Sequence, residues 1–160
     1  MGEAARARAV PHIYTTGNHD RRPAFRQVLG SGHLGPDGAD VALGEVGTGE
    51  HAAVSMVDGL RVVTLDSLVP GQGDGLVTVE QLDWLAELLR RPAPDGTLVA
   101  LHHPPVHLAH HAAGRSVLER PEDLGRVLRG RDVHAVLCGH LHLQLSASLT
   151  ACRSSLPRAS

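Results

Sequence analysis

The chain has 160 residues, of which 12 are His and only three are Phe, Tyr or Trp, and its formal net charge is -2. This length corresponds to about one domain, and a charge near zero excludes the cationic surface with which proteins bind nucleic acids or anionic membranes. Because no window holds the roughly 20 apolar residues of a membrane span and residues 1–10 lack the apolar core of a secretory signal, we expect a cytoplasmic protein.

Residues 10–16 predict the first strand, because they form a short β-branched run that stops at Gly17. Asp20 follows at a position from which it can cap a helix over residues 21–29. The next segment, residues 30–49, is rich in Gly and has little apolar periodicity, which predicts a loop. The chain is therefore expected to start with a strand, a polar turn and a short helix.

Residues 52–57 and 60–65 predict a β-hairpin. Both runs are rich in apolar and β-branched residues, and Asp58-Gly59 between them supplies the positive φ angles of a tight turn. This hairpin is the most specific local prediction in the chain.

The second half of the chain alternates helices with apolar strands. Thr78 and Gln81 form a capping box ahead of leucines at helical spacing, which predicts a helix. Residues 97–101 and 133–138 predict two buried strands, and Pro121 opens a second helix between them. Strands that alternate with helices indicate an α/β fold with layers of sheet and helix.

Three polar clusters each follow a predicted strand. They are Gly17-Asn18-His19-Asp20, His102-His103 and Gly139-His140-Leu141-His142. In open α/β sheets, ligands bind at the carboxyl ends of the strands, so we expect these three loops to form one site.

The residue types in these clusters point to a metal site. In an extended chain, His140 and His142 point the same way about 6.6 Å apart, and their rings could converge on two metals about 3.5–4 Å apart. Asn18 adds a neutral oxygen, and ligation by imidazole and oxygen suits Mn, Fe, Ni, Co or Zn. The two cysteines, Cys138 and Cys152, form no CxxC pair, and Cys138 is expected to be a small buried residue.

His19 has a different expected role from the other histidines. Asp20 lies beside it in the sequence and could fix its tautomer. A His held next to a metal-bound substrate can donate a proton to a leaving oxygen, so His19 is a candidate general acid. The structural alternative for Asn18, His19, His102, His140 and His142 is that they are simply turn or core residues.

These blocks resemble the calcineurin-like metallophosphoesterase superfamily, whose pattern is D-x-H, G-D-x-x-D, G-N-H-[D/E], a lone H and G-H-x-H in that order. The last three blocks are present here, and further segments are similar to the class III cyclic nucleotide phosphodiesterases of that group. Those segments are residues 58–61, 70–71, 81–85 and 101–105. The similarity runs from about residue 13 to residue 142, so we expect residues 1–142 to be the C-terminal part of a catalytic domain and residues 143–160 to be a divergent, disordered tail.

The resemblance implies a layered α/β fold, in which helices flank a β-sandwich. It also implies an enzyme that hydrolyses small phosphodiesters, with cyclic nucleotides as the expected substrates. Asn18, His102 and His140 would ligate one divalent ion, and His142 would ligate a second one. A metal-bound hydroxide would then attack the phosphorus in line.

The resemblance assigns further roles to the residues beside the ligands. His19 would contact the phosphate and protonate the leaving group, and Asp20 would orient His19. In a His-x-Pro alignment the ligand is His102, so His103 would contact the substrate or support the ligands.

The first two blocks of the family pattern are absent. Only 16 residues precede Gly17, and none of them is Asp. These blocks would supply the Asp that bridges the metals, two further ligands, the first strands and a helix. We therefore expect an incomplete fold that holds one divalent ion or none, and a wrong start or a shifted reading frame near Leu143 would explain such a fragment.

Two other functions compete with the phosphodiesterase hypothesis. One is an inactive remnant that binds at most one divalent metal and works only through a partner chain. The other is a structural zinc module, which is disfavoured because its ligands would be scattered over about 120 residues without Cys pairs. The sequence predicts no oligomeric state.

Overall fold

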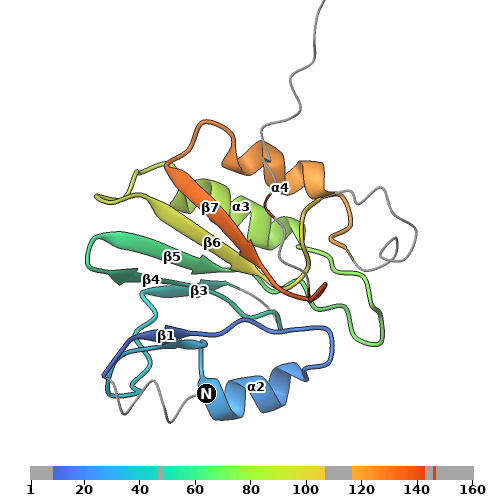
Figure 1. The fold of residues 1–160 in the computed structure, drawn as a ribbon, viewed down its shortest axis with the longest axis horizontal. Coiled ribbons are helices and arrows are strands. Elements are labelled where there is room, and N and C mark those ends of the chain that lie inside the picture. Colours follow the sequence, from blue (N-terminus) through green and yellow to red (C-terminus); the bar gives the residue numbers. More distant parts are fainter. Residues whose placement is uncertain (1–8, 47–48, 107–116, 143–145, 147–160) are drawn as a thin grey trace, which may run out of the picture.

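The computed structural model describes residues 9–46, 49–106, 117–142 and 146. These residues form a five-stranded sheet in the order β3-β4-β5-β6-β7 and a separate pair of strands, β1-β2 (Figure 1). The larger sheet consists of β3 (Gly44–Val46), β4 (Ala52–Val57), β5 (Leu60–Thr64), β6 (Thr97–Leu101) and β7 (Val133–Cys138). The other elements are β1 (His12–Ile13), β2 (His33–Leu34), α2 (Arg22–Leu29), α3 (Val79–Leu88) and α4 (Pro121–Leu128).

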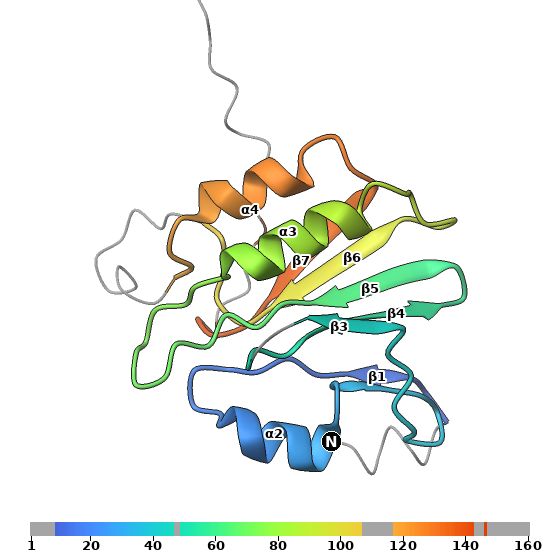
Figure 2. The same ribbon diagram turned by 180° about the vertical axis from the view of Figure 1, so that it is seen from behind.

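The arrangement of these elements confirms the predicted layered α/β fold. Helices α3 and α4 lie together on one face of the five-stranded sheet, whereas α2 lies beside the β1–β2 pair (Figures 1 and 2). Strands β3, β4 and β5 are antiparallel, and β5, β6 and β7 are parallel. In the described part of the chain, no helix is both long enough and apolar enough to span a bilayer.

The predicted hairpin is confirmed. Strands β4 and β5 pair in the register Val57↔Leu60, with Asp58-Gly59 as the turn between them. Both turn residues have positive φ angles, 49° and 88°. These angles are the ones that a two-residue turn needs to match the twist of the flanking strands.

The hydrophobic core lies between the sheet and α3 and α4. Its members are buried leucines and valines at helical spacing on the helix side and at alternate positions on the strands. They include Val63, Leu65, Leu82, Leu85, Leu89, Val99, Leu101 and Leu124. Burial of each Val or Leu side chain contributes about 1.5–3 kcal/mol to the free energy of folding. This cluster therefore supplies most of the stabilisation that holds the helices on the sheet.

Two strand predictions and one loop prediction need correction. The first strand covers only His12–Ile13 rather than residues 10–16, and the segment predicted as a loop, residues 30–49, contains the short strands β2 and β3. Strand β7 is not buried: Leu137 is 54% exposed and Cys138 is exposed. The reason is its position at the edge of the described sheet, where it pairs only with β6.

The predicted cap of α2 is also wrong. The first helical turn follows Arg21 and has no side-chain cap. The Oδ2 atom of Asp20 instead accepts a hydrogen bond from the backbone N–H of Gly17 at 2.7 Å. Asp20 therefore closes the polar turn before the helix and does not cap the helix itself.

Gln81 differs from the prediction in a similar way. Its side chain is fully buried and pairs with the backbone of Asp66, accepting from the N–H at 2.8 Å and donating to the C=O at 2.9 Å. Its Nε2 atom also donates to Thr78 Oγ1 at 3.5 Å, but the Thr78 side chain does not cap the helix, so Gln81 mainly fastens α3 to the chain just beyond β5.

The carboxylate of Asp66 is buried at the junction of both sheets. It accepts hydrogen bonds from Thr16 Oγ1 at 2.7 Å, Arg22 Nε at 2.7 Å, and the backbone N–H groups of Leu68 and His51 at 2.9 Å each. Burial acts to raise the pKa of Asp66, but the hydrogen bonds, from Arg22 first, outweigh it and hold the pKa below its ordinary value. Asp66 is therefore an ionised anchor for α2 and the segment before it.

His33 holds β2 against the larger sheet. Its ring is fully buried, with Nδ1 2.8 Å from Ser55 Oγ of β4 and Nε2 2.9 Å from Thr64 Oγ1 of β5. Burial lowers the pKa of His33 to about 4, although the negative charges of Asp40 and Glu45 act in the opposite direction. His33 is therefore a neutral core residue at pH 7.

Asp66→Asn should destabilise the fold by about 3 kcal/mol, because it leaves the partly buried Arg22 guanidinium without its counter-charge. Chemical denaturation measures the effect. The matched control is Asp83→Asn on the exposed face of α3, which should change the free energy of unfolding by less than about 0.5 kcal/mol. Equal effects of the two substitutions would contradict the anchoring role of Asp66.

His33→Gln should make the free energy of unfolding less dependent on pH below about pH 6.5. Between pH 6.5 and 4 the unfolded chain takes up a proton that folded His33 refuses, so the free energy of unfolding falls with falling pH, by up to about 3 kcal/mol from this group. The variant lacks this one-proton contribution. Denaturation curves at several pH values measure the slope, and parallel profiles for the two proteins would contradict the prediction.

Candidate metal centre

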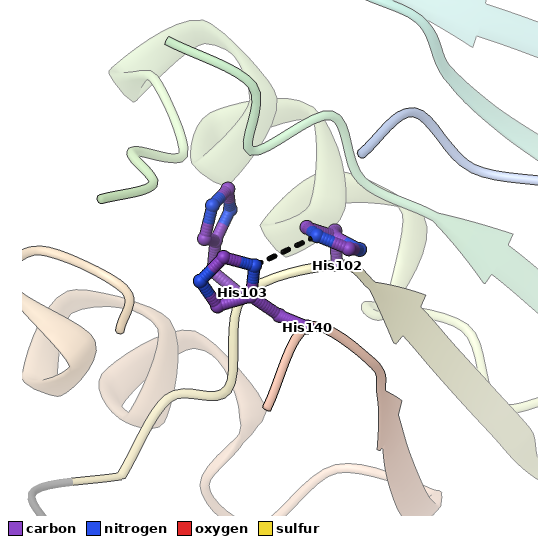
Figure 3. A group of neighbouring side chains, drawn as sticks. All are labelled: His102, His103 and His140. Atoms are coloured by element: carbon purple, nitrogen blue, oxygen red, sulfur yellow. Dashed lines mark hydrogen bonds between the residues drawn. The ribbon is translucent and has the colours of Figure 1, made fainter. Parts of the chain in front are cut away.

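The predicted clusters meet at one edge of the sheet. His102 follows β6 directly, and His140 lies two residues beyond β7, the parallel neighbour of β6. The backbone N–H of Gly139 donates to the C=O of His102 at 3.1 Å, which joins the two loops. Figure 3 shows His102 and His140 turned toward each other, with His103 beside them.

Asn18, His102 and His140 bring three possible metal ligands to one point. Nε2 of His102 lies 3.0 Å from Oδ1 of Asn18 and 2.9 Å from Nδ1 of His140. Adjacent ligands of an octahedral ion with bonds of about 2.1 Å are about 3.0 Å apart, and those of a tetrahedral zinc ion are about 3.3 Å apart. Both distances from His102 Nε2 thus match the spacing of adjacent ligands around a divalent cation.

The charge state of the two histidines also suits a cation. Burial lowers the pKa of His102 and of His140, and the positive charges of neighbouring histidines lower both further. Asp20 acts in the opposite direction on His102, as Asp74 does on His140. Both imidazoles are therefore neutral near pH 7, which is the form that coordinates metals.

The turn after β7 differs from the extended chain that the sequence suggested. His140 and His142 have φ angles of 68° and 52°, in the left-handed region that residues other than Gly rarely occupy. The backbone N–H of Leu141 donates to the C=O of Gly139 at 2.8 Å, closing a three-residue turn. His140 therefore turns into the site, and the strained conformation is of the kind that clusters at functional sites.

His19 and His142 lie at the margin of this group. Both are exposed, yet their positive charges act on His102 and on His140. The side chain of Asp20 accepts a hydrogen bond from the backbone N–H of Gly17. The expected roles of His19, Asp20 and His142 therefore stay predictions.

His103 is the most enclosed histidine of the site. Its side chain is fully buried, and its Nδ1 atom lies 2.8 Å from Ser67 Oγ in a hydrogen bond. Burial, followed by the positive charges of His102 and His140, lowers its pKa to about 4. Its ring packs so closely on the backbone of Gly75 that a Cβ atom there would overlap it.

Sequence reasoning missed the residues that follow β5. Asp66 and Ser67 come directly after the predicted strand 60–65, in the same position as the three His clusters. The signal that was available is this common place at a strand end, where polar residues of α/β sheets gather. Asp74, whose charge acts on His103 and His140, lies in the Gly-rich connection and gives no such signal.

A family model described as calcineurin-like phosphoesterase matches residues 2–144. The chain is 46% identical over 136 residues to a protein of Rhodococcus erythropolis named probable cyclic nucleotide phosphodiesterase. This match covers 85% of this chain and 41% of the relative. It is 43% identical to a cAMP/cGMP dual specificity phosphodiesterase of Mycobacterium tuberculosis, over 85% of this chain and 39% of the relative.

A third relative is more distant. It is the 3',5'-cyclic adenosine monophosphate phosphodiesterase of Escherichia coli K12, which is 29% identical over 85% of this chain and 45% of its own length. The chain thus spans about two fifths of the length of the first two relatives.

Gly75→Ala should destabilise the fold by about 1–3 kcal/mol, because the new methyl group must displace the buried ring of His103. Gly125→Ala in α4 is the matched control, since an added Cβ there has no neighbour within 4 Å. This control should stabilise the fold by about 0.5–1 kcal/mol, as an Ala replaces a helical Gly. Thermal unfolding distinguishes the two, and shifts of the same sign would contradict the prediction.

Proposed function

The chain belongs to the calcineurin-like phosphoesterase family, and from this premise we propose that it is the C-terminal part of the catalytic domain of a metal-dependent phosphodiesterase acting on cyclic nucleotides. Members of this family use a dinuclear metal site. The observation that supports the proposal most strongly is the convergence of Asn18, His102 and His140 from three separate loops. The printed names of the relatives supply the substrate class.

The residues present divide unequally between the two ions of such a site. Asn18, His102 and His140 would hold one divalent ion, and His142 would be a ligand of the other. Divalent ions bound there would neutralise the charge that develops on a phosphoryl group and lower the pKa of a bound water molecule. The identity of the ions, among Mn, Fe, Zn, Ni and Co, stays a prediction of the donor types.

The Gly17–Asp20 turn would present the general acid. Asp20 accepts from the N–H of Gly17, and the N–H of Asp20 donates to the C=O of Gly17 at 3.0 Å, so both ends of the turn are fixed. His19 is exposed between them, and its charge acts on His102 and His140, two of the proposed ligands. From there it can meet a phosphoryl group and donate a proton to the leaving oxygen.

The remaining assignments extend the same proposal. A small phosphodiester is the partner that this site would take, and we infer that residues 1–142 belong to the catalytic domain. Residues 143–145 and 147–160, predicted as a divergent tail, lie outside the described residues. The cytoplasmic location stays a prediction of the sequence.

Hydrolysis of bis(4-nitrophenyl) phosphate and of cyclic AMP with added Mn²⁺ tests the proposal. His140→Ala should lower the rate at least about 100-fold, because it removes a ligand. His134→Ala is the control, since His134 lies on β7, the strand that precedes His140, but is exposed and contacts the backbone of Asp95. Equal rates for wild type and His140→Ala would refute the proposed enzymatic activity. Binding of an ion without hydrolysis would favour the inactive remnant.

A further inference from the structure

His103 carries a buried nitrogen that the proposed metal site does not use. Its Nε2 atom is shielded from solvent and makes no hydrogen bond of standard geometry among the described residues, although the backbone of Gly73 lies close enough to act on the ring. Its other nitrogen, Nδ1, is already engaged by Ser67. A buried polar atom without a partner costs free energy, and in native structures it is usually explained by a function or a bound group.

The surroundings of His103 indicate what that group is. One ring nitrogen from each of His102, His103 and His140 lies within 4.8 Å of the others. The ring centre of His103 is 4.9 Å from that of His102 and 4.6 Å from that of His140, and none of the three rings stack in parallel (Figure 3). Three imidazoles gathered in this way are a typical ligand set for a divalent cation.

We propose that His103 is itself a metal ligand, so that Asn18, His102, His103 and His140 form a four-ligand site for one divalent ion. The proposal rests on the metal-dependent function argued above, but it adds a ligand that the family pattern leaves out. Opposite ligands of an octahedral ion are about 4.2 Å apart, so the three histidine nitrogens, which all lie within 4.8 Å of one another, have to close by no more than about 0.6 Å.

Ser67 and Gly75 hold His103 in the orientation that a ligand needs. A metal-bound His usually hydrogen bonds through its second ring nitrogen to an oxygen, which fixes its tautomer. Ser67 Oγ supplies that oxygen for Nδ1 and also accepts from the backbone N–H of His103 at 3.3 Å. Gly75 leaves room for the ring because it has no side chain, since a Cβ atom at this position would overlap the imidazole of His103.

The backbone explains how two adjacent histidines can share one site. In an extended strand, neighbouring side chains point to opposite faces, so His102 and His103 would be separated. Strand β6 ends at Leu101, and the chain bends at both histidines. The bend brings both rings to the same side, where His140 meets them.

The test counts imidazole ligands by X-ray absorption spectroscopy of the Zn²⁺-loaded chain, and calorimetric titration with Zn²⁺ gives affinity and stoichiometry. The parent protein carries His19→Ala and His142→Ala, so that exposed imidazoles do not contribute to the count. We expect one ion per chain with three imidazoles. Two imidazoles in this parent, or no bound ion, would overturn the proposal.

Substitutions separate ligation from support. His103→Ala should reduce the count to two and weaken binding at least about 10-fold, whereas Ser67→Ala should keep three imidazoles and weaken binding by no more than about 10–100-fold. His134→Ala should change neither value. The number of imidazole ligands in the parent protein is measured with His103 in place. The test is therefore decisive even if the His103→Ala variant does not fold. Because no substrate is used, failure of hydrolysis would not affect this outcome.

Discussion

The buried carboxylate of Asp66 is the constraint on which the rest of the structure depends. An ionised group without solvent contact is tolerated only when hydrogen bonds surround it, and Asp66 receives them from two side chains and two backbone N–H groups. Its own backbone is paired with Gln81. One residue therefore joins the first strand pair, α2, α3 and the end of β5.

This anchor is linked to two parts of the candidate metal site, the turn that carries Asn18 and the ring of His103. Thr16, which donates to Asp66, directly precedes the turn that carries Asn18. Ser67, which follows Asp66, binds the ring of His103. Asn18 and His103 come from loops that are far apart in the sequence, and both loops are tied to the segment around Asp66. These loops therefore need little regular structure of their own.

The sequence predicted those parts of the molecule that depend on local rules. Asp58-Gly59 predicted the hairpin because the turn geometry restricts the residue types, and the leucine spacing predicted α3 because a helix buries one face. The clusters around Asn18, His102 and His140 were predicted to meet because strand ends gather at one edge of a sheet. All three predictions need only short segments and the spacing of apolar and polar residues within them.

The sequence did not predict choices that depend on distant partners. Gln81 has the residue type of a helix cap, but the backbone of Asp66, 15 residues away in the sequence, binds its oxygen instead. The exposure of β7 depends on which strand lies at the edge, and the left-handed turn at His140 depends on contacts after the strand ends. No pattern within a single segment contains this information.

The two ions of the family site should not depend equally on this part of the chain. The donors proposed for the first ion are held by partners within the described residues: Ser67 fixes His103, and the Gly139 backbone joins the loops of His102 and His140. His142 is exposed after a strained turn, outside the group of convergent histidines. Because a ligand that is already oriented loses less conformational entropy on binding, we expect the first ion to bind to this chain by itself and the second to need further ligands.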